Sequence, residues 1–190
     1  MGNVCLDRDG FTLGGKRRVL LVGSLFYFRV PRAHWRDRME KLKLAGYHAL
    51  DVYFPWNYHE LAPGSWDFAG ERDAGAFLDL AQETGLYVVA RPGPYICSEW
   101  DGGGLPAWLF ASDMRIRDND PAYLRQVSAW YDRILPLLRE HSATRGGCVI
   151  AVQLENELDF YSGTRDRPGY ITALRDMAQK HGMDVPLLCC

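Results

Sequence analysis

The sequence has 190 residues, 47% of them apolar, which is enough for one domain with a sizeable buried core. Its 22 basic and 24 acidic residues give a net charge of −2, and no basic run points to nucleic acid or to a membrane surface. No apolar stretch approaches the roughly 18 residues of a membrane-spanning helix, and none opens the chain as the core of a secretion signal.

Strand-like and helix-like segments alternate along the chain. Pro31 suits the first turn of a helix, and Asp73 and Asp120 suit helix N-caps. In order, we expect a strand over 18–28, a helix from 31 to 46, a strand over 48–54, a helix from 73 to 85, a strand over 86–90, a long connection over 95–119, a helix from 121 towards 138, a strand over 148–154, a helix over 170–180 and a strand over 185–190.

This alternation indicates an α/β fold with a parallel sheet and right-handed crossovers. No GxGxxG follows the first strand and no GxxxxGK[ST] occurs, so the nucleotide-binding versions of such sheets are disfavoured. We therefore expect a (β/α)8 TIM-barrel type of fold. Residues 1–190 would form the amino-terminal portion of one catalytic barrel, with only about its first five strands.

The cysteines and aromatic residues limit the kinds of site that the chain could form. The five cysteines contain no CxxC pair, so they indicate neither a disulfide framework nor a zinc site. We expect reduced thiols, no metal, no cofactor and a cytoplasmic location. Aromatic residues make up 13% of the chain and include six tryptophans. Most should pack in the core, but rings at a rim also stack on the faces of sugars.

Polar and aromatic residues follow three of the expected strands. The run from Cys148 to Leu154 is apolar except for Gln153, as in a strand covered on both faces, and acidic residues follow it directly. Active sites of barrels lie at the carboxyl ends of the strands, so these residues should share one rim. They are Tyr53 and Trp56, then Glu99 and Trp100, then Asn156 and Glu157.

Five blocks of the sequence, in order and spread over most of the chain, resemble glycoside hydrolase family 35, the retaining β-galactosidases. The blocks are Tyr27–Pro31, Tyr53–Glu60, Arg91–Trp100, Gly103–Leu109 and Gln153–Glu157. The resemblance implies retaining hydrolysis of terminal β-D-galactosyl residues, with a galactoside as the small-molecule partner.

The resemblance also implies roles for individual residues. Glu157 would be the general acid/base, and Asn156 would hold a sugar hydroxyl. The galactose pocket would be lined by Tyr53, Ile96, Cys97, Ser98 and Glu99. The chain departs from the family pattern at three positions: Phe26 replaces the usual His, Cys148 the usual Pro, and Leu158 the usual Tyr.

The acid pair Glu155 and Glu157 cannot supply both catalytic carboxyls. Side chains two apart on a strand point the same way, with α-carbons roughly 6.5–7 Å apart. A retaining glycosidase needs its carboxyls on opposite sides of the sugar, about 5–5.5 Å apart. We expect Glu157 to be the acid/base, buried among Trp and Tyr; the alternative is an exposed strand-end glutamate. Glu155 should brace Arg91 or another inward-facing group. Asn156 shares the pocket only if the strand ends or bulges there.

Other candidates have two interpretations each. Glu99 would bond sugar hydroxyls or form a loop salt bridge with an Arg, and Trp56, Trp100 and Trp108 would stack on sugar or pack in loops. Cys97 has no supporting His motif, so a backbone contact is favoured over a nucleophile. His48 and His59 lack metal-ligand spacing, and we expect both to be structural.

The nucleophile is expected at the end of a seventh strand, beyond the last residue of this sequence. A complete barrel takes about 250 residues and eight strands, and five strands cannot close. We expect a fragment or one piece of a split enzyme, with little hydrolysis on its own and a complementing chain as its partner. The alternative is a non-catalytic or degenerate galactose-binding half-barrel.

Overall fold

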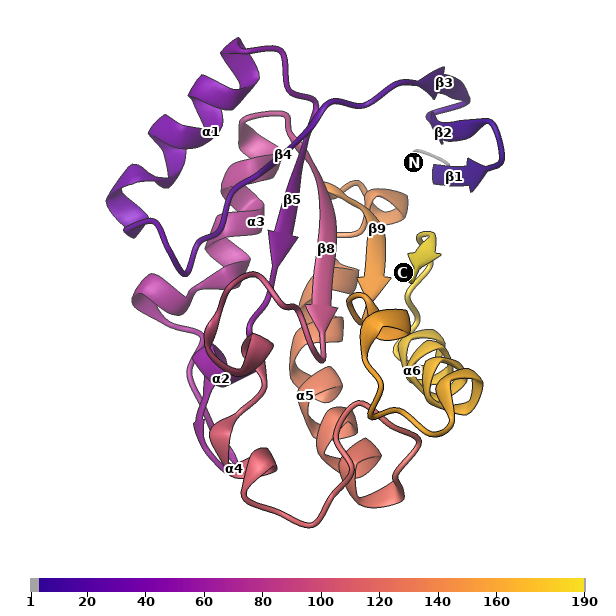
Figure 1. The fold of residues 1–190 in the computed structure, drawn as a ribbon. Coiled ribbons are helices and arrows are strands. Elements are labelled where there is room, and N and C mark those ends of the chain that lie inside the picture. Colours follow the sequence, from indigo (N-terminus) through magenta and orange to yellow (C-terminus); the bar gives the residue numbers. More distant parts are fainter. Residues whose placement is uncertain (1–3, 190) are drawn as a thin grey trace.

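The computed structural model describes residues 4–189, and its centre is a five-stranded parallel sheet in the order β10-β9-β8-β5-β4 (Figure 1). Strands that follow one another in the sheet also follow one another along the chain. An open doubly wound sheet reverses its strand order at a switch point, and this sheet has none. The order is that of a barrel. The strands are β4 (Val22–Ser24), β5 (Ala49–Tyr53), β8 (Tyr87–Gly93), β9 (Val149–Leu154) and β10 (Leu187–Leu188).

Four longer helices alternate with these strands. Helices α3 and α5 pack against β8 and lie behind the strands in the view of Figure 1, and α6 packs against β9. The helices are α1 (Trp35–Leu44), α3 (Ala74–Glu83), α5 (Pro121–Glu140) and α6 (Arg167–Lys180). The connections hold the short helices α2 (Trp56–His59) and α4 (Ala107–Phe110) and the hairpin β6–β7 (Glu60–Ala62 and Ser65–Trp66).

The expected caps fix where two helices begin. The Asp73 carboxylate accepts from Ala76 N at 2.9 Å, and that of Asp120 accepts from Ala122 N at 2.8 Å. Each satisfies a backbone donor that the first helical turn leaves free. Helix α6 begins three residues earlier than expected, because Asp166 caps it by accepting from Gly169 N at 3.0 Å.

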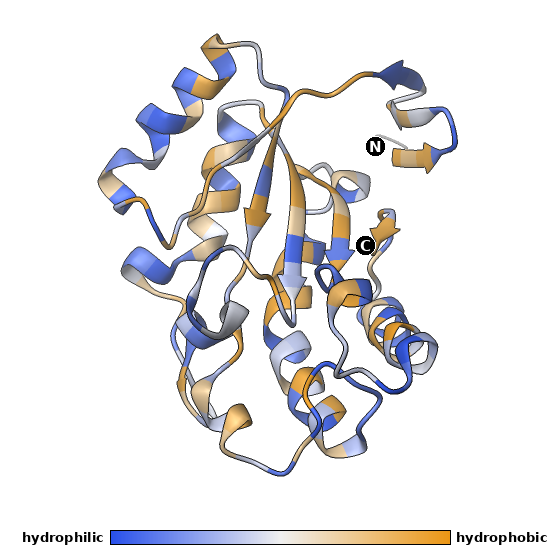
Figure 2. Ribbon diagram, in the orientation of Figure 1, coloured by the Kyte–Doolittle hydropathy of each residue, from blue (hydrophilic) through white to orange (hydrophobic). Residues whose placement is uncertain are grey.

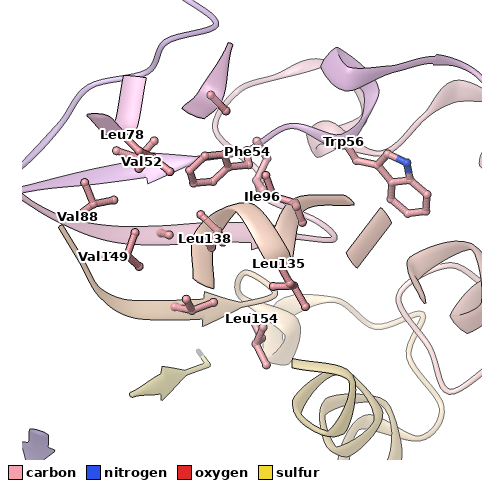
Figure 3. Close-up of a cluster of buried hydrophobic side chains, with 14 of the residues drawn as sticks. Val52, Phe54, Trp56, Leu78, Val88, Ile96, Leu135, Leu138, Val149 and Leu154 are labelled. Carbon is pink, nitrogen blue, oxygen red and sulfur yellow. The ribbon is translucent and has the colours of Figure 1, made fainter. Parts of the chain in front are cut away.

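The core fills the space between the sheet and its helices (Figure 3). Val52 and Phe54 from β5 and the residue after it, Val88 from β8, and Leu138 from α5 are fully buried there. Each such side chain contributes about 1.5–3 kcal/mol by leaving water. Alternate strand residues therefore face the helices, and the side chains between them face the other side of the sheet.

The amino-terminal region differs from our expectation of a strand over 18–28. Only Val22–Ser24 join the central sheet, and Val19 is 89% exposed. An antiparallel sheet precedes it, made of β1 (Val4–Asp7), β2 (Gly10–Leu13) and β3 (Lys16–Arg18). Leu13 anchors this sheet on Ile150 of β9. Strands of three or four residues are too short for their own hydropathy pattern to reveal them.

The last expected strand, over 185–190, is reduced to Leu187–Leu188, which pair in parallel with β9. Cys190 lies outside the described residues.

Candidate functional site

A depression of about 340 Å³ opens at the carboxyl ends of β5, β8 and β9. Figure 2 shows the ends of β8 and β9 turning hydrophilic there. Six of the seven residues that the sequence proposed for the site line it: Tyr53, Cys97, Ser98, Glu99, Asn156 and Glu157. The remaining lining residues are Ser24, Phe26 and Arg91. The seventh, Ile96, is fully buried in the core, and only its carbonyl reaches the site, where Arg91 Nη1 donates to it at 3.4 Å.

The turn after β9 brings Asn156 and Glu157 into the same depression. The strand ends at Leu154, and Glu155 and Glu157 then adopt left-handed backbone angles, with φ of 64° and 45°. This conformation is uncommon for residues with a Cβ atom. The condition that the sequence set for Asn156, a strand that ends before it, is thereby met.

Glu155 lies beneath the depression and is fully buried. Its carboxylate accepts from Arg117 Nε at 3.1 Å and Arg117 Nη2 at 2.7 Å, and from Tyr170 Oη at 2.9 Å. Burial raises the pKa of Glu155, and the donors of Arg117 oppose that shift. The group that Glu155 braces is therefore Arg117. Arg91, which the sequence suggested, has other partners.

Arg91 orients Asn156. Its Nη1 donates to Asn156 Oδ1 at 2.6 Å and its Nη2 to Gln153 Oε1 at 3.1 Å, while its guanidinium lies 3.8 Å from the centre of the Tyr53 ring. A guanidinium has only donors, so the amide oxygen of Asn156 must face Arg91. The amide nitrogen is then left to donate to a ligand.

The loop after β8 carries three consecutive residues in the left-handed region: Cys97, Ser98 and Glu99, with φ of 59°, 61° and 45°. Arg29 holds the loop by donating to the carbonyls of Ser98 and Glu99. The buried Ser98 Oγ has no hydrogen-bond partner among the described residues, and within that part of the chain the exposed Glu99 carboxylate forms no salt bridge. Backbone strain of this kind is concentrated at functional sites.

Glu157 itself is exposed, which corrects our expectation that Trp and Tyr bury it. It separates the main depression from a smaller one of about 190 Å³, in which Tyr95, Phe160 and Tyr161 are its aromatic neighbours. Among residues 4–189, no tryptophan lines either depression.

The three tryptophans of the loops pack against protein. Trp56 is fully buried, and Trp108 packs edge-on against it with 6.1 Å between ring centres. Trp100 donates from Nε1 to Asn57 Oδ1 at 2.9 Å. These contacts favour loop packing over sugar stacking.

His48 and His59, the two histidines expected to be structural, both bond to neighbouring elements of the fold. His48 Nδ1 accepts from Leu21 N at 3.2 Å. The buried His59 lies 2.9 Å from the Asp67 carbonyl and 2.5 Å from Tyr27 Oη.

Sequence reasoning missed Arg117 and Arg29, because an arginine in a loop carries no pattern that reveals its acceptors. Phe26 was marked only as a departure from the family pattern, and it lines the depression with its ring 4.7 Å from that of Tyr53. No helix among residues 4–189 is both long and apolar enough to cross a bilayer.

Known proteins with related sequences include several β-galactosidases. The β-galactosidase of Mus musculus is 47% identical over 156 residues, which are 82% of this chain and 24% of that protein. The β-galactosidase of Homo sapiens is 45% identical over 162 residues, or 85% of this chain and 24% of that protein. The chain thus spans about a quarter of the length of these curated relatives.

Solved structures show the same fold at low sequence identity. The exo-β-1,4-mannosidase Op5Man5 from Opitutaceae bacterium strain TAV5 has a TM-score of 0.72 and 17% identity, over 90% of this chain and 32% of that one. The β-galactosidase from the psychrophilic Marinomonas ef1 has a TM-score of 0.52 and 17% identity, over 72% of this chain and 21% of that one. The sequence profile of glycosyl hydrolases family 35 matches residues 10–189. Since this match covers nearly the whole sequence, the chain belongs to glycosyl hydrolases family 35.

Proposed function

We propose that this chain supplies the acid/base half of the active site of a retaining β-galactosidase. The observation that carries the proposal is the meeting of Asn156 and Glu157 with Tyr53 and Glu99 in one depression, in a chain of family 35. The substrate would be a terminal β-D-galactosyl residue, as the names of the curated relatives suggest. A volume of about 340 Å³ lies within the range of small-molecule pockets, about 300–1,000 Å³.

Glu157 would act at the oxygen that leaves the sugar. In the first step it gives this oxygen a proton, and in the second it takes a proton from the attacking water. Its place on the rim, open to solvent on one side, leaves room for the leaving group and later for the water.

Asn156 and Tyr53 would bind the sugar as neutral groups. The Asn156 amide nitrogen, directed by Arg91, donates to the sugar 2-hydroxyl, a contact that strengthens in the transition state. Burial raises the pKa of Tyr53 to about 12, so its phenol stays protonated at neutral pH. The Glu99 carboxylate, exposed at the rim, accepts from other sugar hydroxyls.

Retaining hydrolysis also needs a nucleophilic carboxylate on the opposite face of the sugar. Among the described residues, Glu99 is the only other carboxylate that lines the depression, and its proposed task is binding. The described sheet leaves one side of β4 and one side of β10 unpaired. We assign the nucleophile to polypeptide that completes the barrel along these edges, in keeping with the complementing partner expected from the sequence.

The test combines this chain with a polypeptide that carries the remaining strands of a family 35 barrel and its nucleophilic Glu. We expect Glu157→Gln to lower kcat on an alkyl β-galactoside about 10²–10⁴-fold, the usual contribution of a general acid. The loss on a dinitrophenyl β-galactoside should be much smaller in the glycosylation step, because that leaving group departs without a proton.

Glu140→Gln is the matched control, since Glu140 is an exposed carboxylate at the far end of α5. Equal activity of wild type and Glu157→Gln on the alkyl galactoside would refute the proposal. Galactose binding that survives Glu157→Gln, with no hydrolysis in any complemented assembly, would support the non-catalytic half-barrel instead.

A further inference from the structure

Arg117 reaches the turn that carries Glu157 from a distant part of the chain. It lies in the connection between α4 and α5, and its side chain is only 7% exposed. Besides its two bonds to the Glu155 carboxylate, its Nη2 donates to the Asn156 carbonyl at 2.5 Å. One planar guanidinium thus binds a side chain and a backbone group of the same turn.

Glu155 extends this contact to the other side of Asn156. Its Oε2 accepts from the Asn156 backbone nitrogen at 2.7 Å. The ion pair therefore fixes both peptide groups that flank the α-carbon of Asn156. Because a peptide group is planar, fixing the Asn156 carbonyl also fixes the position of the next nitrogen and α-carbon, which belong to Glu157.

The turn needs such support. Glu155 and Glu157 both have left-handed backbone angles, which residues with a Cβ atom keep only where the surrounding structure imposes them. Tyr170 supplies a further donor to the Glu155 carboxylate, at 2.9 Å. With donors from Arg117, Tyr170 and Asn156, this carboxylate is committed to holding the turn.

Arg117 is itself held in place. Its guanidinium lies 3.7 Å from the centre of the Tyr95 ring and 4.7 Å from that of Tyr161, and its carbonyl accepts from Thr164 Oγ1 at 2.7 Å. Tyr95 and Tyr161 also line the smaller depression beside Glu157.

We propose that Arg117 is a positioning residue that aims the carboxyl of Glu157 at the leaving oxygen by clamping the turn through Glu155 and the Asn156 carbonyl. The proposal rests on the function proposed above for Glu157. It requires arginine in particular, because a lysine is a single charged point and cannot span the Glu155 carboxylate and a backbone carbonyl at once with fixed geometry.

Arg117→Lys tests the clamp while keeping Glu155 paired with a positive charge, which a smaller neutral residue would not do. In the complemented assembly we expect the rate on an alkyl β-galactoside to fall about 10²-fold, the cost of a misplacement of about 1 Å. The kcat/KM on the dinitrophenyl galactoside, which reports the glycosylation step alone, should fall less than about tenfold, because that step needs no acid when the leaving group is activated. Arg115→Lys, in the same loop but paired with Asp118, is the control and should change neither rate.

A second readout uses the 190-residue chain by itself. We expect amide hydrogen exchange of residues 156–158 to accelerate in Arg117→Lys and in Arg117→Met/Glu155→Gln, while exchange in β5 stays unchanged. The double variant removes both charges and so avoids an unpaired one in the interior.

The outcomes separate the two proposals. Equal losses on both substrates, or unchanged exchange at 156–158, would overturn the positioning role while wild-type hydrolysis leaves the proposed function intact. A wild-type assembly that hydrolyses neither substrate would overturn the proposed function and the aiming role with it, whatever the exchange shows.

Discussion

Arg91 determines which end of the Asn156 amide faces the depression. Arg91 offers only donors, so it selects the amide oxygen of Asn156 and leaves the amide nitrogen for the depression. In the function proposed above, this amide nitrogen would donate to the sugar 2-hydroxyl, a hydrogen bond that strengthens in the transition state. The order of the residues gives no hint of this orientation, because it depends on a side chain 65 positions away.

Asn156→Asp tests this orientation with nearly unchanged shape. The carboxylate still accepts from Arg91, but it presents an acceptor to the depression where the amide presented a donor. We expect kcat/KM of the complemented assembly on a β-galactoside to fall about 10²–10³-fold, as when one transition-state donor is removed. A 2-deoxy-β-galactoside lacks the hydroxyl concerned and should lose far less. Equal losses on the two substrates would contradict the assigned contact.

For helices and strands, the sequence correctly predicted the features that depend on neighbouring residues, such as helix caps and apolar runs. The Asp73 and Asp120 caps and the apolar run of β9 were all identified from sequence, and the structure confirms them. The exposed run at Val19 was misassigned, because hydropathy favours a strand whether or not a neighbouring strand exists to pair with it.

The sequence did not predict the backbone conformation of the two loops that shape the depression. The family resemblance placed Cys97–Glu99 in the pocket, and the sequence expected Asn156 to share it with Glu157 only if the strand ended or bulged there. It gave no sign of the left-handed backbone at either loop. Neither run contains glycine, and each is bound by an arginine from elsewhere, Arg29 or Arg117. Only the folded molecule brings these partners together.

Helix α5 depends on its cap, which Asp120→Ala removes. The Asp120 carboxylate accepts from the backbone nitrogens of Ala122 and Tyr123, at 2.8 Å and 3.3 Å. Without it we expect the free energy of unfolding in urea to fall by about 1 kcal/mol. Asp120→Ser should restore most of the loss, since serine is an equally good cap. Asp113→Ala, an exposed residue of the preceding loop, should change little. A fall of the same size in Asp113→Ala would show that the cap is not the cause.

For the whole molecule, the sequence predicted the class of fold better than the bounds of its first and last strands. Alternation of strands and helices without a nucleotide-binding loop led to a barrel, and the strand order along the chain agrees. Polar side chains such as Asp51 and Gln153 remain half-buried on the face of the sheet away from the helices. That face is where the proposed completing strands would enclose the site.

His59 makes the stability of the whole chain depend on pH. It is fully buried, and its Nδ1 must carry the proton because its neighbour, the Asp67 carbonyl, only accepts; Nε2 then accepts from Tyr27. Burial lowers the pKa of His59 from 6.5 to about 4. Between these values the unfolded chain binds the extra proton and the folded chain does not, so stability is complete above about pH 6.5 and falls as the pH drops towards 4.

The shift in His59 corresponds to a loss of up to about 3 kcal/mol at the acid end of this range. Urea unfolding at pH 4.5 and pH 7.5 measures it. His59→Gln lowers stability at pH 7.5, because the ring contacts are lost, but it should reduce the difference between the two pH values. His34→Gln, at an exposed histidine, should leave that difference as in the wild type. The comparison of the two variants separates the effect of His59 from that of carboxylates that titrate in the same range. An undiminished difference in His59→Gln would mean that the acid sensitivity of the fold arises elsewhere.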